Sequence, residues 1–282
     1  MKRIIIPTDF SANAYNALAY ALHLFADEKC LFYLLHAYSP PMPEATNIMT
    51  SANTAKKLIE LTQESTQKGL DEVLQKIETS FKNPNHSFET IPAFGFLTDV
   101  INEIAKEKNA DLIIMGTKGA SGLKEIILGS NTSRVIGNAR LPLIVVPENA
   151  VYEHLNEIAF FTDYESYFKA GEINFLLELA RQSKAALHVV HVLKKGELLG
   201  PEKQKIQEDL TKKCEPIKAE FHLLTENDIE NAIRLFVQSR NTPFLCLVTK
   251  KYTFLQNLFK TPTTKEVSFH TKTPMLVLKK AH

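Results

Sequence analysis

Four of the ten glycines of the chain lie within residues 115–132, MGTKGASGLKEIILGSNT. Glycine inside a regular element costs roughly 0.5–1 kcal/mol relative to alanine, so this grouping predicts a backbone that something approaches closely. Gly116 and Gly119 begin the segment, and Gly129-Ser130 ends it at a predicted helix start. Unpaired N–H groups and the helix dipole favour an anion there, and the Ser130 hydroxyl adds a donor. The segment therefore predicts a phosphate-binding site.

An acidic residue, Asp9, follows the first predicted strand in the run Pro7-Thr8-Asp9. Ligands of open α/β sheets bind beyond the carboxyl ends of the strands, where the winding direction reverses. A strand order of 3-2-1-4-5 would place Asp9 and Gly116 on neighbouring strands. Asp9 would then accept hydrogen bonds from a ribose or base, or contact Mg²⁺. A capping role on the next helix stays open, because Asp and Ser11 are both good N-cap residues.

Other nucleotide motifs are absent from the chain. A P-loop requires Lys after its last glycine, and here Leu123 follows Gly122. A dinucleotide fingerprint requires glycines after the first strand, where this chain has none. His188 and His191 are three residues apart on a predicted strand and point to opposite faces, so no metal pair is expected there. We assign no catalytic residue and no metal centre beyond the Asp9 contact.

Apolar runs alternate with helical patterns and predict the elements that position these residues. Nearly continuous apolar strands, each followed by a helix, indicate a parallel sheet covered on both faces. The fold class is therefore doubly wound α/β, with five parallel strands in order 3-2-1-4-5. The predicted strands are residues 3–8, 30–37, 87–93, 111–116 and 141–147. Helices are predicted after Ser11, over 51–81, around 100–105 and from Ser130. In the long helix a core-facing stripe is expected, made of Leu58, Leu61, Leu70, Leu74, Ile77 and Phe81.

The second half of the chain repeats the first. IIIPTDFS at 4–11 corresponds to IAFFTDYES at 158–166, and the segments from Gly116 and Val248 onward align without a gap. The second copy is shorter, mostly between its second and third strands. We therefore predict two tandem domains, residues 1–148 and 149–282.

The second copy lacks the glycines of the first. At the four positions of Gly116, Gly119, Gly129 and Ser130 it has Val248, Lys251, Thr261 and Pro262. Proline has no N–H to donate, and the other three residues add side chains to the segment. One phosphate site per chain is predicted, in the first half.

Composition excludes several classes of function. Lys and Arg (33) balance Asp and Glu (32), so no basic surface is expected to attract nucleic acid. No window approaches the roughly 20 apolar residues of a membrane span. Cys30 and Cys246 lie in apolar runs and are expected to be buried thiols. A reduced, cytoplasmic location is expected.

The spacing Gly116-x2-Gly119-x9-Gly129-Ser130 resembles the G-x2-G-x9-G-[ST] motif of the universal stress protein family. The runs IIIPTDFS and LPLIVVP are similar to that family as well, and the resemblance extends over the chain as two tandem copies. It implies an adenine-nucleotide alpha-hydrolase-like fold that holds ATP or AMP. It also implies a role in stress tolerance, at most weak ATP hydrolysis, and dimeric or pseudo-dimeric pairing through the last strands.

The same resemblance implies roles for particular residues. The phosphates would lie against the glycines, Ser130 and Asn131, Asp9 would contact the nucleoside, and His36 and Ala37 would border the base. The nucleotide-binding set is Pro7, Thr8, Asp9, His36, Ala37, Met115, Gly116, Thr117, Gly119, Gly129, Ser130, Asn131 and Thr132.

Three functional hypotheses remain. The first is a stress-response protein that binds ATP or another adenine nucleotide, with Mg²⁺ as an optional companion, while the second domain is a degenerate partner. The second is a slow ATPase, and the third is a scaffold with incidental nucleotide binding. Pairing of LPLIVVP with TPMLVLK inside one chain would mimic a dimer, and a homodimer stays open.

Overall fold

The computed structural model describes residues 1–39, 52–117, 129–164, 173–248 and 272–278. The described residues form two compact units, divided between 141 and 142. The predicted boundary at 148 falls seven residues later than this division, so the last strand of the first repeat is grouped with the second unit.

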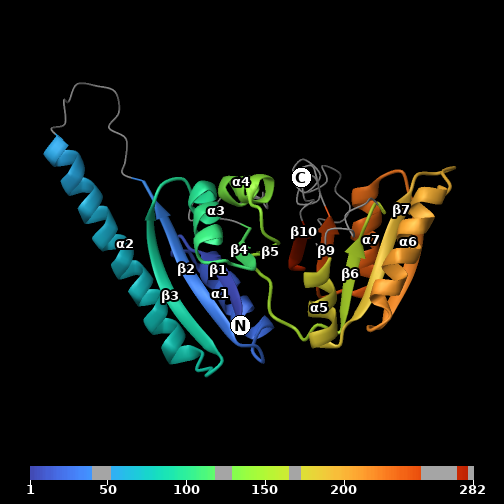
Figure 1. Ribbon diagram of the computed structural model, residues 1–282, viewed down its shortest axis with the longest axis horizontal. Helices are drawn as coiled ribbons and strands as arrows, with labels where there is room; N and C mark the ends of the chain where they lie inside the picture. The colour runs from blue at the N-terminus through green and yellow to red at the C-terminus, as the bar shows by residue number, and fades with distance from the viewer. Residues whose placement is uncertain (40–51, 118–128, 165–172, 249–271, 279–282) are drawn as a thin grey trace. The chain divides into compact units, whose positions relative to one another are not determined.

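The first unit contains the elements that carry the predicted nucleotide-binding residues (Figure 1). Its strands β1, β2, β3 and β4 are all parallel to their neighbours. In chain order the elements are β1 (Lys2–Pro7), α1 (Ala12–Leu24), β2 (Cys30–Tyr38), α2 (Ala52–Ser80), β3 (His86–Phe94), α3 (Leu97–Glu107), β4 (Leu112–Gly116) and α4 (Ser130–Asn138).

The second unit repeats this alternation with a shorter second helix, as the sequence predicted. Helix α6 has 14 residues where α2 has 29. In chain order the elements are β5 (Leu143–Val146), β6 (Glu157–Phe161), α5 (Asn174–Ser183), β7 (Ala186–Leu193), α6 (Pro201–Cys214), β8 (Ala219–Thr225), α7 (Ile229–Arg240), β9 (Leu245–Val248) and β10 (Met275–Leu278).

The strand order confirms the doubly wound α/β class. It is β3-β2-β1-β4-β5 in the first repeat and β8-β7-β6-β9-β10 in the second. Strands β1 and β4 are adjacent, with Ile4 opposite Leu112, and the winding direction reverses between them. Since parallel crossovers are right-handed, α1 and α2 cover one face of the first sheet and α3 and α4 the other.

The last strands of the two repeats pair with each other. Strand β5 runs antiparallel to β10, with Val145 opposite Met275 and Leu143 opposite Val277. These residues are completely buried. This pairing is the reason that β5 belongs to the second compact unit.

Local signals explain why α1 begins and how α2 packs. The Ser11 hydroxyl accepts a hydrogen bond from the Ala14 N–H over 3.2 Å and caps α1, as the sequence allowed. The predicted stripe of α2 is only partly a core stripe: Leu70 and Ile77 are buried, but Leu58 and Leu61 are 38% and 54% exposed. Helix α2 is about 44 Å long and the nine-residue strands beneath it are about 30 Å long, so one end extends past the sheet.

The three cysteines are buried and free, as expected for Cys30 and Cys246. Burial raises the pKa of Cys30 to about 12 and that of Cys214 to about 11. None of the helices in the described ranges is long and apolar enough to cross a membrane.

Candidate functional site

A cavity of about 350 Å³ lies at the carboxyl ends of β1, β2 and β4 and at the start of α4. It collects all of the predicted nucleotide-binding residues except two: Thr117 is buried and does not line it, and Gly119 lies outside the described residues. The lining residues are Pro7, Thr8, Asp9, Ala14, His36, Ala37, Leu97, Met115, Gly116, Gly129, Ser130, Asn131 and Thr132. Sequence reasoning missed Ala14 and Leu97, because only the tertiary fold brings the first turns of α1 and α3 to this edge.

The turn after β1 positions Asp9. The Thr8 hydroxyl oxygen accepts a hydrogen bond from the Phe10 N–H over 3.0 Å, and an Asp9 carboxylate oxygen accepts one from the Ser11 N–H over 3.1 Å. Phe10 has a φ of 65°, a left-handed conformation that costs a non-glycine residue roughly 1–2 kcal/mol. The N-cap of α1 is therefore Ser11, and Asp9 lies two residues before it, at the cavity.

His36 is held against the same turn by two contacts. Its Nδ1 donates a hydrogen bond to the Thr8 carbonyl oxygen over 2.7 Å. Its ring stacks on Phe10, with ring centroids 4.5 Å apart and an interplanar angle of 22°. A neutral imidazole that donates through Nδ1 has only Nε2 left, as an acceptor. His36 is thus tied to the backbone of β1 and forms one wall of the cavity.

The structure gives a steric reason for glycine at position 116 that the sequence did not reveal. A Cβ placed on Gly116 would lie 2.8 Å from the Asn13 side-chain nitrogen, so the buried Asn13 of α1 occupies the space that a side chain would need. The Gly116 backbone is also linked to α4, because the Thr132 hydroxyl donates a hydrogen bond to the Gly116 carbonyl oxygen over 2.9 Å. Close packing with α1 thus accounts for this glycine independently of any ligand.

The start of α4 supplies the donors of the cavity. The Gly129 N–H donates to the Thr117 carbonyl oxygen over 2.7 Å, so it is not one of the unpaired donors of this helix start. The first helical bond runs from the Ser133 N–H to the Gly129 carbonyl oxygen. The N–H groups of Ser130, Asn131 and Thr132 therefore have no acceptor within the helix. Together with the helix dipole they favour an anion.

The second unit contains the same turn, with the corresponding two rings buried. The Thr162 hydroxyl accepts from the Tyr164 N–H over 3.1 Å, Tyr164 has a φ of 55°, and the His191 Nδ1 donates to the Thr162 carbonyl oxygen over 2.7 Å. Tyr164 and His191 are 1% and 2% exposed, whereas Phe10 is 41% exposed. Of the replaced motif positions only Val248 is described, at the end of β9; Lys251, Thr261 and Pro262 lie outside the described residues.

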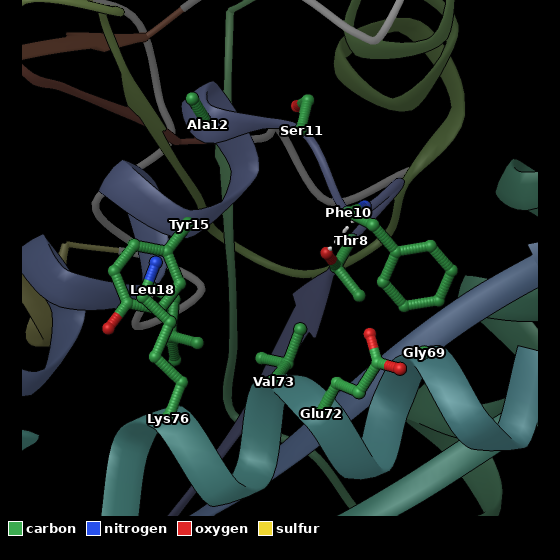
Figure 2. Close-up of a pocket in the computed structure, with 10 residues that line it drawn as sticks. All are labelled: Thr8, Phe10, Ser11, Ala12, Tyr15, Leu18, Gly69, Glu72, Val73 and Lys76. Carbon is green, nitrogen blue, oxygen red and sulfur yellow. Dashed lines mark hydrogen bonds between the residues drawn. The ribbon is translucent and has the colours of Figure 1, made fainter. Parts of the chain in front are cut away.

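A second cavity of about 440 Å³ lies on the other side of the β1–α1 turn, between α1 and α2 (Figure 2). Thr8 lines both cavities. The Phe10 ring points toward Gly69 of α2, where a Cβ would lie 2.7 Å from the ring. On the same helix the Lys76 ammonium lies 3.7 Å from the centroid of the Tyr15 ring. The absence of a side chain at Gly69 therefore leaves room for the Phe10 ring, which stacks on His36.

The parallel sheet and its strand order define a doubly wound α/β protein, and a cavity lies where the winding direction reverses. The sequence model of the universal stress protein family matches residues 1–147. The chain belongs to the universal stress protein family.

Two curated relatives are universal stress proteins of Methanocaldococcus jannaschii. One is 34% identical over 147 residues, covering 51% of this chain and 81% of the relative. The other is 30% identical over 152 residues, covering 51% of this chain and 94% of the relative. Both matches take in about half of this chain.

The fold of the whole chain is similar to a solved structure of a universal stress protein from Archaeoglobus fulgidus. The TM-score is 0.69 at 18% identity, and the match covers 99% of this chain and 98% of the other. The fold of the second half therefore has a counterpart within the same family, although the family model matches only the first half.

Proposed function

We propose that this universal stress protein binds one adenine nucleotide, ATP or AMP, in the cavity of the first unit. The observation that carries the proposal is the convergence of Asp9, His36 and the first turn of α4 on one cavity. A volume of about 350 Å³ lies within the usual range for small-ligand sites.

Each wall of the cavity suits one part of the ligand. The amides of Ser130 and Asn131 and the dipole of α4 would hold phosphate oxygens. The Asp9 carboxylate would accept hydrogen bonds from the nucleoside. Asp9 is also the one carboxylate among the described lining residues. A single carboxylate with phosphate oxygens and water is a usual Mg²⁺ environment, so a Mg²⁺ ion accompanying the nucleotide would contact Asp9.

The proposed activity is retention of the nucleotide, with at most weak hydrolysis. The described lining residues include one carboxylate and one imidazole, and the Nδ1 of that imidazole already donates to a backbone carbonyl. Occupancy would then influence the conformation or the partners of the protein. A slow ATPase and a scaffold with incidental binding are the alternatives.

The second domain, residues 149–282, is proposed to be a degenerate partner. In its version of the β1 turn the side chains of Tyr164 and His191 are buried, which supports a structural role. The antiparallel pairing of β5 with β10 supports an arrangement in which the last strands of the two repeats replace a dimer contact. A further homodimer of the chain is open to measurement by sedimentation. The buried, free cysteines support a reducing, cytoplasmic location.

The proposal is tested by titrating the nucleotide-free chain with ATP, AMP and GTP in a calorimeter. One adenine nucleotide per chain is expected, with GTP weaker. Nucleotide carried through purification is identified by denaturing the protein and separating the supernatant by anion exchange. Phosphate release over hours, with and without Mg²⁺, distinguishes retention from slow hydrolysis. No binding of any adenine nucleotide, or binding only to the second unit, would overturn the proposal.

A further inference from the structure

Three side chains with metal-ligating atoms meet on β7 and β8 of the second unit. His188 on β7 lies opposite Glu220 on β8, and Val190 lies opposite His222. Because side chains two residues apart on a strand share a face, His188, Glu220 and His222 all lie on one face of the sheet. They belong to the two strands at one end of the strand order.

The distances between the three potential ligand atoms suit one small cation. The His188 Nδ1 lies 3.0 Å from the His222 Nε2 and 3.5 Å from a Glu220 carboxylate oxygen, and the last two atoms are 3.9 Å apart. Tetrahedral coordination with bonds of about 2.1 Å separates ligand atoms by about 3.4 Å. The three separations lie on either side of this value.

We propose that His188, Glu220 and His222 form a binding site for a divalent transition metal ion of the zinc type. Two imidazoles and one carboxylate favour zinc and its neighbours over Mg²⁺ or Ca²⁺, which prefer oxygen ligands. The His188 side chain is 1% exposed, whereas those of His222 and Glu220 are 26% and 49% exposed. A fourth coordination position would therefore face solvent on the Glu220 side.

The other two residues around His188 decide which of its nitrogens is available. Arg240 Nη2 lies 3.0 Å from the His188 Nε2, and a Glu157 carboxylate oxygen lies 3.5 Å from the same nitrogen. Arginine only donates, so in this arrangement the His188 Nε2 accepts, and its Nδ1 carries the proton and donates to His222. This hydrogen-bonded histidine pair is the metal-free state.

Metal binding requires the opposite tautomer of His188. The proton moves from Nδ1 to Nε2, and the Nε2–H then donates a hydrogen bond to the Glu157 carboxylate, in the carboxylate–histidine–metal arrangement that orients many metal ligands. The charge of His188 does not change in this step. Arg240 has to move away from the His188 Nε2, and it keeps its two hydrogen bonds to the Glu157 carboxylate, of 2.9 and 3.1 Å. The apolar side of the site is formed by Phe236 of α7, whose ring centroid lies 5.3 Å from that of His222.

The charged groups around the cluster support a neutral, ligating His188. Burial and the positive charge of Arg240 lower its pKa, and these effects outweigh the opposing carboxylates of Glu157 and Glu220. A metal ligand must be an unprotonated imidazole. The metal would link β7 to β8, which stands at the end of the strand order, and would therefore stabilise an edge strand.

The test uses the full chain, stripped with a chelator, and measures Zn²⁺ affinity by competition with a chromophoric chelator. One tight site is expected in the unchanged protein. His222→Gln and Glu220→Gln are each expected to weaken it at least tenfold, and circular dichroism verifies that both variants are folded. The matched control is His154→Gln, at an exposed histidine outside the cluster, which should leave the affinity unchanged. Equal Zn²⁺ affinity in His222→Gln and the unchanged protein would overturn the proposal.

A second variant separates a metal site from a purely structural histidine pair. Arg240→Met removes the donor that competes for the His188 Nε2 and the nearby positive charge, so it should tighten Zn²⁺ binding by several-fold. Zn²⁺ should also raise the melting temperature of the unchanged chain by a few degrees, while Mg²⁺ at the same concentration should not. Weaker Zn²⁺ binding in Arg240→Met, or equal effects of Zn²⁺ and Mg²⁺ on melting, would count against the site.

Discussion

The His36 Nδ1 donates a hydrogen bond to the Thr8 carbonyl oxygen over 2.7 Å. His191 bears the same relationship, over the same distance, to Thr162 in the second unit. Since the second repeat lacks the glycines of the motif and still makes this contact, the contact belongs to the fold and does not depend on that motif. In the first unit this turn opens onto a cavity, and helix α4 begins with available amides.

The amide at the start of α4 can be removed without disturbing the helix. Ser130 is the first residue of α4, a position where proline is well tolerated. Ser130→Pro should weaken ATP binding by roughly 10- to 100-fold, because it removes an amide donor to a charged oxygen worth about 1.5–3 kcal/mol. Ser130→Ala keeps the amide and removes only the hydroxyl, so its loss should be smaller. Calorimetry compares the two variants. Because Ser130→Pro removes the hydroxyl as well as the amide N–H, an equal loss in Ser130→Ala would assign the contact to the hydroxyl instead.

The repeat itself supplies a second pair of variants. Gly119→Lys, which copies Lys251, should abolish nucleotide binding, because a side chain enters the segment where the backbone must approach the phosphates. Lys251→Gly should not create a second site, since Val248, Thr261 and Pro262 remain. The measurement is the number of nucleotides bound per chain. Two per chain in Lys251→Gly, or one in Gly119→Lys, would contradict the assignment.

Gly116 provides a stability test that involves no ligand. A Cβ there would lie 2.8 Å from Asn13, so Gly116→Ala should destabilise the first unit by about 1–3 kcal/mol. Gly137 of α4 has nothing within 4 Å of its Cβ position, and Gly137→Ala should stabilise by about 0.4–1 kcal/mol. Urea unfolding followed by circular dichroism measures both. If Asn13→Ala restores the stability of Gly116→Ala, the clash is the cause; equal stability of Gly116→Ala and the unchanged chain would refute it.

The buried His191 predicts loss of stability in acid. Burial lowers its pKa in the folded chain, and the hydrogen bond with the Thr162 carbonyl opposes this effect without cancelling it. Below the ordinary pKa of about 6.5 the unfolded chain takes up a proton that the folded chain does not, so stability falls as the pH falls from 7 toward 5. One group contributes at most about 1.4 kcal/mol per pH unit.

The matched variant for this pH effect is His191→Asn. The asparagine amide can donate to the Thr162 carbonyl but does not titrate, so the stability of the variant should depend less on pH. His188, whose pKa is also lowered, keeps part of the slope in both proteins. Urea midpoints at pH 5, 6 and 7 measure the effect. An unchanged slope in the variant would show that other groups cause the acid sensitivity.

Much of the fold and part of the site could be read from local patterns. The apolar runs and helical spacings predicted the strands around Ile5 and Ile113, the Ser11 cap and the start of α4 at Ser130. Comparison of the two halves predicted the shortened second helix. These features follow from periodicity and composition over a few residues. Such local patterns do not depend on which distant segments of the chain pack together.

Other features depend on contacts between residues far apart in the chain. The Asn13 side chain occupies the space that a side chain at position 116 would need, and the Phe10 ring does the same at position 69. The length of α2 explains why Leu61 is exposed. His222 became the neighbour of His188 only through the register of β7 and β8.

The amino-acid sequence alone thus determined the fold class, the tandem repeat and the half of the chain that carries the glycine motif. The tertiary structure decided which donors are available, which glycines are sterically required and which histidines meet. The physical reason is that backbone preference and hydrophobic periodicity are local, whereas strand register, helix overhang and side-chain exclusion arise only when distant segments pack together.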